Sequence, residues 1–309
     1  MPKLASKDVL RADQFSKDEI SLIMKLAGEY ESALLQGKVL NVMDGKILST
    51  LFYEPSTRTR LSFEAAMLRL GGTVVSVAEA KSSSASKGES LHDTIKTVEG
   101  YADVIVLRHP QIGSAEEAAQ ATDTPVLNAG DGAGQHPTQS LLDFYTIQKE
   151  KGAVDGQTIV LAGDLKNGRT VHSLALLLSD YDVKFIFVAP QALQMPREIV
   201  DRLKANGTEV EETEDLAEGL KSGDVLYMTR IQKERFEDPA EYERLKGSFV
   251  LTRKHLDQAK DGISIMHPLP RVNEIAEDMD DYSGAAYFRQ AANGVPVRMA
   301  LLALVCGQA

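Results

Sequence analysis

The sequence has 309 residues, enough for about two domains that each bury a core. Its 34 Lys and Arg residues against 45 Asp and Glu residues give a formal net charge of −11, which opposes broad electrostatic binding of nucleic acid or of an anionic membrane surface. The single cysteine, Cys306, excludes an intrachain disulfide framework and a cysteine-based zinc site, and it favours a reducing, cytoplasmic setting.

The first half of the chain alternates between helical and strand patterns. The opening residues lack the apolar core of a signal peptide, and residues 16–37 follow as an amphipathic helix with Ser16 and Glu19 at capping-box spacing. Short apolar runs bounded by turn residues predict strands at residues 46–52, 73–77, 104–107 and 125–127. Helical patterns separate them at residues 59–70, 90–101, 115–121 and 138–151. This alternation predicts βαβ units and a mainly parallel sheet.

A second alternation follows a Gly- and Asp-containing break at residues 152–156. Strands are expected at residues 157–162, 183–188, 225–228 and 263–266, and helices at residues 169–178, 196–205 and 214–220. The last apolar run, residues 295–305, predicts a helix after Asn293-Gly294. The longest apolar stretch, residues 299–306, is too short for a membrane span.

These patterns predict an α/β protein with two doubly wound parallel-sheet domains and the active site in the cleft between them. We expect the first domain at residues 1–150, joined by the C-terminal helix of residues 287–309, and the second at residues 151–286.

The most informative motif is residues 52–60, Phe-Tyr-Glu-Pro-Ser-Thr-Arg-Thr-Arg, between a predicted strand and a predicted helix. Free N–H groups at the start of a helix attract anions, and three hydroxyls with two guanidinium groups at that point favour a phosphate site. The alternative is an ordinary N-cap with Arg58 and Arg60 on a solvated face. The motif is not a Walker A loop, because no G-x-x-x-x-G-K-[ST] is present.

Two further polar segments follow predicted strands of the first half. Arg108 ends one strand and is expected to reach the same crevice, although a surface charge is an equal alternative. Residues 128–139 form a glycine-rich polar loop that leads into a helix and brings His136 and Gln139 within one helical turn. His136 could polarise a carbonyl or move a proton, whereas a lone histidine is more often structural.

In the second half, guanidinium groups recur near predicted strand ends. Arg169 opens a helix, Arg230 and Gln232 follow one strand, and Arg271 follows another. Individually each is more often a surface ion pair, but together they favour a dicarboxylate or anionic amino-acid site. The loop before Arg169 lacks G-x-G-x-x-G, which argues against NAD binding.

The sequence predicts no metal and no cofactor. Its six histidines show neither H-E-x-x-H nor Cys/His spacing, and no Gly-x-Ser-x-Gly elbow supports a covalent nucleophile.

Taken in order, the motifs closely resemble those of the aspartate carbamoyltransferase family over nearly the whole chain. The segments that carry the resemblance are residues 52–60, 87–89, 108–110, 136–139, 163–165, 168–173, 229–234 and 267–271. Ser-Thr-Arg-Thr-Arg marks the wider carbamoyltransferase family. Pro268 stands where ornithine enzymes have a Cys, and their Ser-Met-Gly loop is missing, so the resemblance favours aspartate as the acceptor.

The resemblance implies transfer of a carbamoyl group from carbamoyl phosphate to L-aspartate, giving N-carbamoyl-L-aspartate and phosphate, the committed step of pyrimidine synthesis. By motif position, the residues implied to bind carbamoyl phosphate are Ser56, Thr57, Arg58, Thr59, Ser83, Lys87, Arg108, His136, Gln139 and Leu269. Of these, Arg58, Thr59, Lys87, Arg108 and His136 are the implied catalytic residues. The implied aspartate-binding residues are Lys87, Arg169, Arg230, Gln232, Leu269 and Pro270.

The resemblance also implies a homotrimer, because Ser83 and Lys87 reach the neighbouring subunit's active site in this family. Residues 108–113 resemble members that assemble with separate zinc-containing regulatory chains. One departure is Asn167, which stands where well-known members have a Tyr implicated in stabilising open or closed arrangements. The alternatives are a carbamoyltransferase for ornithine or another amine, and a non-catalytic relative that only binds anions.

Overall fold

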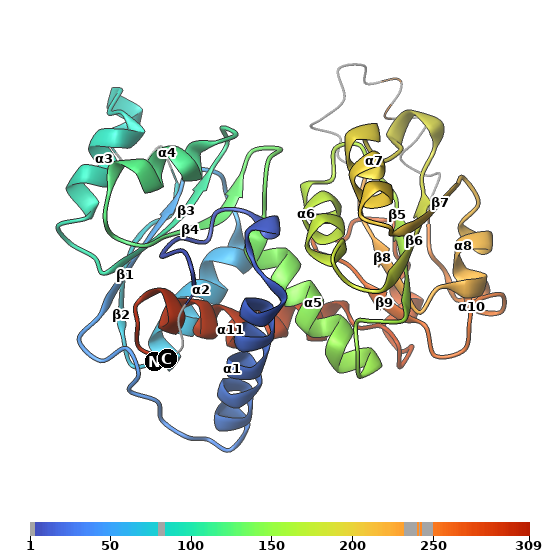
Figure 1. Cartoon of the computed structure of the whole chain (residues 1–309), viewed down its shortest axis with the longest axis horizontal. Coiled ribbons are helices and arrows are strands. Elements are labelled where there is room, and N and C mark those ends of the chain that lie inside the picture. Colours follow the sequence, from blue (N-terminus) through green and yellow to red (C-terminus); the bar gives the residue numbers. More distant parts are fainter. Residues whose placement is uncertain (1–3, 80–83, 232–239, 241, 243–249) are drawn as a thin grey trace. The chain divides into compact units, whose positions relative to one another are not determined.

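The structure is a computed structural model that describes residues 4–79, 84–231, 240, 242 and 250–309. The chain divides into two compact units (Figure 1). One comprises Met1–Leu142 with Asn293–Ala309, and the other comprises Asp143–Ala292. The chain passes between these units inside two helices, α5 (Pro137–Lys151) and α11 (Tyr287–Val305), whereas the sequence predicts the boundary at the break of residues 152–156.

The first unit is built on a four-stranded parallel sheet in the order β2-β1-β3-β4. Its strands are β1 (Ile47–Phe52), β2 (Thr73–Val77), β3 (Val104–His109) and β4 (Val126–Asp131). Its helices, besides parts of α5 and α11, are α1 (Lys17–Leu35), α2 (Thr57–Arg69), α3 (Leu91–Val98) and α4 (Ser114–Ala121). Leu51, Ile105 and Val126 pack against α3 and α4 on one face of the sheet, and α2 lies on the other face (Figure 1).

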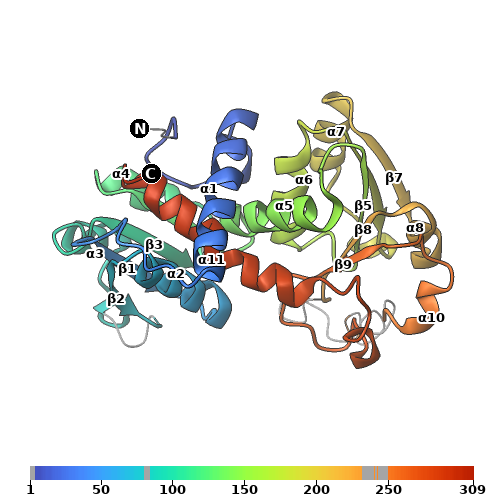
Figure 2. The ribbon, with the colours of Figure 1, turned by 90° about the horizontal axis from the view of Figure 1, so that it is seen from below.

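The second unit contains a five-stranded parallel sheet in the order β7-β6-β5-β8-β9. Its strands are β5 (Gln157–Ala162), β6 (Val183–Val188), β7 (Glu209–Thr213), β8 (Val225–Met228) and β9 (Ser264–Met266). Its helices are α6 (Arg169–Leu178), α7 (Arg197–Ala205), α8 (Leu216–Ser222) and α10 (Arg253–Leu256), with parts of α5 and α11. In two perpendicular views α6 lies on one face of this sheet and α8 on the other (Figures 1 and 2).

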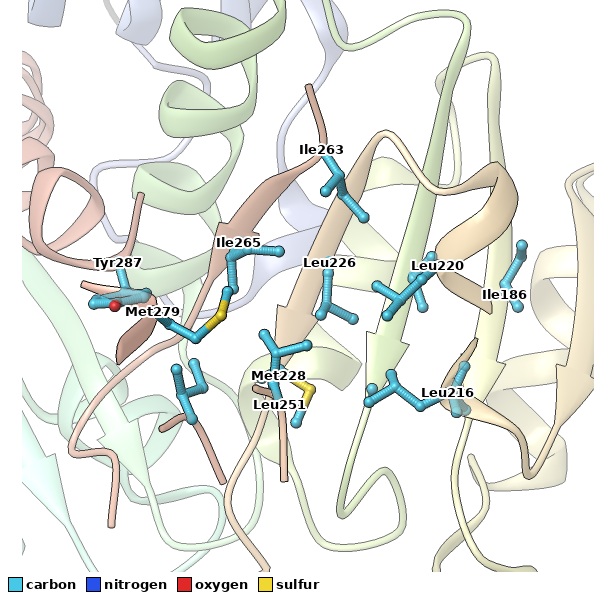
Figure 3. Packing of buried hydrophobic residues seen from close by; sticks show 14 residues of the cluster. Ile186, Leu216, Leu220, Leu226, Met228, Leu251, Ile263, Ile265, Met279 and Tyr287 are labelled. Carbon is cyan, nitrogen blue, oxygen red and sulfur yellow. The ribbon is translucent and has the colours of Figure 1, made fainter. Parts of the chain in front are cut away.

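One apolar cluster fills the face of the second sheet that α8 covers (Figure 3). Leu226 and Met228 of β8, Ile265 of β9 and Leu220 of α8 belong to this cluster, and all four side chains are fully buried. Since each fully buried aliphatic side chain stabilises the folded state by about 1.5 to 3 kcal/mol, this cluster stabilises the packing of α8 on the sheet.

The predicted fold class, two α/β units on parallel sheets, is confirmed. The structure differs from the element predictions at several points. Strand β7 was not predicted, because its sequence Glu-Val-Glu-Glu-Thr has a single apolar residue on an exposed edge. Strand β4 runs on through Asn128–Asp131, which the glycine pattern predicts as loop. Helix α11 begins at Tyr287, as expected for the C-terminal helix of residues 287–309, and thus before the apolar run of residues 295–305.

Candidate functional site

Each sheet has one place where the chain reverses the direction in which it adds strands. In the first unit it lies between β1 and β3, and in the second it lies between β5 and β8. Ligands of doubly wound sheets bind at the carboxyl ends of the strands at such switch points, because the loops on either side diverge there. The predicted site residues follow these strands or the strands beside them.

The start of α2 supplies the first group of the first unit. Ser56 is the N-cap residue, but its side chain makes no capping hydrogen bond, so the ordinary capping interpretation does not account for this serine. Thr59 is buried within the first turn. Arg58 is exposed, although partial desolvation of its guanidinium group lowers the pKa of Arg58 below its usual value. The arrangement suits an anion next to free helix N–H groups.

Arg108, on β3, lies beside this turn because Phe52 of β1 pairs with it in the sheet register. Arg108 is only 8% exposed, so the alternative that it is a surface charge is wrong. Nη1 donates to the Ala129 carbonyl oxygen at 3.0 Å, and Nη2 lies 3.1 Å from Oε1 of Glu54. These two contacts hold the buried, positively charged Arg108 side chain at the switch point between β1 and β3.

The segment between β4 and α5 is fixed by Asp131. Its Oδ1 accepts a 2.6 Å hydrogen bond from the Gln135 N–H, and its Oδ2 accepts from the Gly113 N–H at 2.9 Å. His136 immediately precedes α5 and is buried, as is Gln139 in the first turn. The structure therefore brings the strand ends that carry Arg108, His136 and the start of α2 to one edge of one sheet.

In the second unit, a constrained loop leads from β5 to Arg169, the first residue of α6. The buried carboxylate of Asp164 accepts hydrogen bonds from the Asn167 backbone N–H at 3.0 Å and from Asn167 Nδ2 at 3.1 Å. His172 Nε2 lies 2.6 Å from the Leu165 carbonyl oxygen, and burial lowers the pKa of His172, which favours a neutral ring that donates there. Asn167, the departure from the family pattern, thus stabilises the loop that presents Arg169.

Arg230 follows β8 at the other side of this switch point and is partly exposed. The two loops touch: the Thr229 N–H donates to the Ala162 carbonyl at 2.8 Å, and a Cβ on Gly163 would lie 2.2 Å from the Thr229 carbonyl oxygen. Only glycine fits this approach at φ +115°. Arg169 and Arg230 are therefore carried by adjoining loops.

Residues 267–270 follow β9, which pairs with β8. Leu269 is partly buried with φ +57°, Pro270 is exposed, and the peptide bond between them is cis. Arg271, which the sequence grouped with the candidate carboxylate ligands, forms a bidentate ion pair with Asp280 at 2.5 and 2.6 Å. This ion pair with Asp280 gives Arg271 a structural role in place of the carboxylate-binding role that the sequence suggested.

Three predicted residues lie away from these clusters or outside the described chain. Lys87 ends a 3-10 helix, Ser84–Lys87, and is exposed. Ser83 and Gln232 lie outside the described residues. Within the described residues, no group of three or more His, Cys, Asp and Glu side chains is arranged to hold a metal ion. No described helix is both long and apolar enough to cross a membrane.

Sequence reasoning did not single out Glu54 or Asp131, which hold Arg108 and the His136 loop. Glu54 stands inside the motif of residues 52–60, but its type alone does not indicate a partner 54 positions further on. Asp131 stands among glycines, where an Asp is expected to bond its own backbone, and that expectation could have identified it.

Two family models together match almost the whole chain. Residues 7–149 match the carbamoyl phosphate-binding domain of the aspartate and ornithine carbamoyltransferases, and residues 155–305 match their aspartate- or ornithine-binding domain.

Individual relatives are similar over their full length. The aspartate carbamoyltransferase catalytic subunit of Thermococcus kodakarensis is 54% identical over 301 residues, which cover 97% of each chain. The solved catalytic subunit of M. jannaschii aspartate transcarbamoylase is 50% identical with a TM-score of 0.91, covering 97% of this chain and 98% of that one. The Trypanosoma cruzi enzyme, solved with carbamoyl phosphate and aspartate, is 44% identical with a TM-score of 0.93, covering 98% of each chain.

Proposed function

The chain belongs to the aspartate and ornithine carbamoyltransferase family, and on that premise we propose that it transfers the carbamoyl group of carbamoyl phosphate to the amino group of L-aspartate. The products are N-carbamoyl-L-aspartate and phosphate. The observation that carries the proposal is that each unit gathers cationic side chains at its own switch point, Arg108 beside the start of α2 in one and Arg169 with Arg230 in the other. Two anionic substrates match two such clusters.

Carbamoyl phosphate is assigned to the first unit. Its phosphate would be held by the first turn of α2 and by Arg108, through the residues Ser56, Thr57, Arg58, Thr59 and Arg108. Its carbonyl oxygen would accept hydrogen bonds from Thr59, Arg108 and His136, and Gln139 would bind its amino group. The buried positions of Thr59, Arg108, His136 and Gln139 support these roles, because donors fixed by packing need little reorganisation.

Aspartate is assigned to the second unit, Asp143–Ala292, which contains the predicted aspartate-binding domain of residues 151–286. Arg169 and Arg230, with Gln232, would bind its two carboxylates, because the planar guanidinium group binds a carboxylate through two parallel hydrogen bonds. The Leu269 backbone carbonyl would accept a hydrogen bond from the attacking amine, with Pro270 beside the substrate.

The reaction needs no cofactor. The uncharged aspartate nitrogen attacks the carbonyl carbon, a C–N bond forms, and the bond from that carbon to the phosphate oxygen breaks. The leaving phosphate takes the proton that the amine loses. A donor aimed at the developing oxyanion contributes about 3 to 4 kcal/mol in a preorganised site.

A direct assay of the acceptor tests this proposal. The purified chain is given carbamoyl phosphate with either L-aspartate or L-ornithine, and each carbamoylated product is quantified. We expect turnover with aspartate alone, because Pro268 replaces the Cys of ornithine enzymes and cationic groups oppose the charged side chain of ornithine. Turnover with ornithine and none with aspartate would overturn the assignment. Tight binding of a bisubstrate analogue without turnover would instead favour a non-catalytic relative.

We further propose a homotrimer with shared active sites, in which Ser83 and Lys87 act in the neighbouring subunit's site. Separate zinc-containing regulatory chains are proposed as partners at residues 108–113, because close relatives are named catalytic subunits. Ile112 in this segment is 63% exposed and would be covered by such a partner. Action in the cytoplasm fits the single cysteine, Cys306, because disulfide frameworks belong to oxidising compartments.

A further inference from the structure

Leu269 has a backbone conformation that needs support. Its φ of +57° lies in the left-handed region, which costs a residue with a Cβ roughly 1 to 2 kcal/mol. Such residues persist where surrounding contacts hold them, and they concentrate at ligand-binding positions. The contacts that hold Leu269 therefore decide where its carbonyl oxygen points.

His267 holds the peptide of Leu269 through its ring. The Leu269 N–H donates to His267 Nδ1 at 2.7 Å, so Nδ1 must accept and the ring proton must reside on Nε2. Nε2 in turn lies 2.7 Å from Oε1 of Glu274, and both side chains are buried. Glu274 thus fixes both the tautomer and the plane of the ring.

Glu274 stays ionised in this setting. Burial raises its pKa, but hydrogen bonds from His267 and from the Val272 N–H outweigh burial, so the net pKa of Glu274 is lowered. Its Oε2 accepts from the N–H groups of Val272 and Asn273, each at 3.1 Å. One carboxylate therefore holds both the histidine ring and the far end of the same loop.

The backbone of His267 is tied to the two helices that carry the chain between the units. Its N–H donates to Oε1 of Gln290 on α11 at 2.8 Å, and Nε2 of Gln290 donates to Asp143 on α5 at 2.6 Å. The Tyr227 hydroxyl of β8 donates to the other oxygen of Asp143 at 2.9 Å. All of these side chains are buried, so the network is satisfied without solvent.

We propose that His267, oriented by Glu274 and Gln290, is a positioning residue that sets the Leu269 carbonyl oxygen for recognition of the acceptor amine. The proposal rests on the aspartate-binding role given to Leu269 under the proposed function. His267 touches no substrate in it and acts only by fixing the Leu269 peptide.

Two substitutions at His267 separate its two hydrogen bonds. In His267→Asn the side-chain oxygen takes the place of Nδ1 and still accepts from Leu269, but the bond to Glu274 is lost. In His267→Gln the side-chain amide reaches Glu274, but the acceptor for Leu269 is lost. We expect His267→Gln to raise the KM for aspartate tenfold or more with unchanged affinity for carbamoyl phosphate, and His267→Asn to raise that KM less than threefold.

Tyr227→Phe is the matched control. It removes one buried hydrogen bond from the same network at the end away from Leu269, and we expect a lower Tm with an unchanged KM for aspartate. Equal effects of the two His267 variants on that KM, in proteins that melt cooperatively, would overturn the proposal. So would a normal KM in His267→Gln. If the wild-type chain turns over no aspartate at all, the proposed function fails first, and the two failures are distinguishable.

Discussion

At the scale of single residues, Arg58 lies in the turn that begins α2 and Arg108 lies beside it, but Arg108 is buried and Arg58 is exposed. Arg108 is held by the Ala129 carbonyl and by Glu54, so replacing it would disturb packing as well as charge. Arg58 belongs to the exposed class, and a substitution there changes the candidate phosphate site with little effect on the core.

We therefore predict that Arg58→Ala lowers kcat/KM for carbamoyl phosphate by about 100-fold or more, because one charged donor is lost from the phosphate site. Stability should change by less than about 0.5 kcal/mol. Steady-state kinetics and a thermal melt measure both quantities. Arg60→Ala is the control and should keep most activity. In the wild-type chain Arg60 Nε lies 3.9 Å from Glu64 Oε1. Comparable losses in the two variants would contradict a specific role for Arg58.

The sequence predicts which strand ends carry polar side chains, because apolar runs and turn residues determine where strands stop. It does not predict the partners that hold them. Glu54 beside Arg108 and Glu274 beside His267 are paired by sheet register and by the fold of a loop, which residue types alone do not specify. Ser83 and Gln232 remain predictions, since they lie outside the described residues.

At the scale of elements, the loops after β3 and β4 approach each other at a glycine. Gly132 has φ +56°, its N–H donates to the His109 carbonyl at 2.8 Å, and a Cβ there would lie 2.3 Å from the Pro110 carbonyl oxygen. This close approach precedes His136 by four residues, so it helps to determine where that side chain lies.

Gly132→Ala is expected to destabilise the fold through both strain and overlap. Gly37 provides the control, because it also has a positive φ, +68°, but a Cβ there would meet no atom within 4 Å. Its replacement by Ala adds backbone strain without overlap. Gly37→Ala should cost about 1 to 2 kcal/mol, and Gly132→Ala should cost at least about 1 kcal/mol more. Denaturant unfolding measures the difference. Equal losses would mean that the loop relaxes away from Pro110.

Element boundaries were predictable where a pattern repeats. The Ser16–Glu19 capping box that starts α1 is present, with the Glu19 N–H donating to Ser16 Oγ at 3.3 Å and the Ser16 N–H donating to Glu19 at 2.9 Å. The sequence does not predict strand β7, because only Val210 in it is apolar. Backbone hydrogen bonds to β6 hold it at the edge of the sheet.

At the scale of the whole molecule, a chain with a net charge of −11 places Arg108, Arg169 and Arg230 at its two switch points. The net charge opposes binding to extended anionic surfaces, but it does not prevent small anionic substrates from binding in a local cationic pocket. The fold class followed from the alternation of patterns, whereas the assembly did not, because the surface between subunits has no periodic signature.

The proposed trimer makes a prediction about mixed subunits. Lys87→Ala and Arg58→Ala variants are each expected to be nearly inactive. After dissociation and random reassociation in equal amounts, about one quarter of shared sites would combine an intact Lys87 with an intact Arg58 from a neighbour. We therefore expect activity to rise toward about one quarter of the wild-type value. No rise, with subunit exchange verified by mass labels, would argue against shared sites.

The division of the first unit into two chain segments has a consequence for synthesis. Residues 143–292 form the second unit in one stretch, so this unit is complete before residues 293–309 leave the ribosome. At bacterial-to-eukaryotic elongation rates those 150 residues take roughly 8 to 30 seconds. During that interval the nascent first unit lacks Val297, Leu301 and Leu302, which are fully buried in the finished protein. The segment made first is thus the one that finishes folding last.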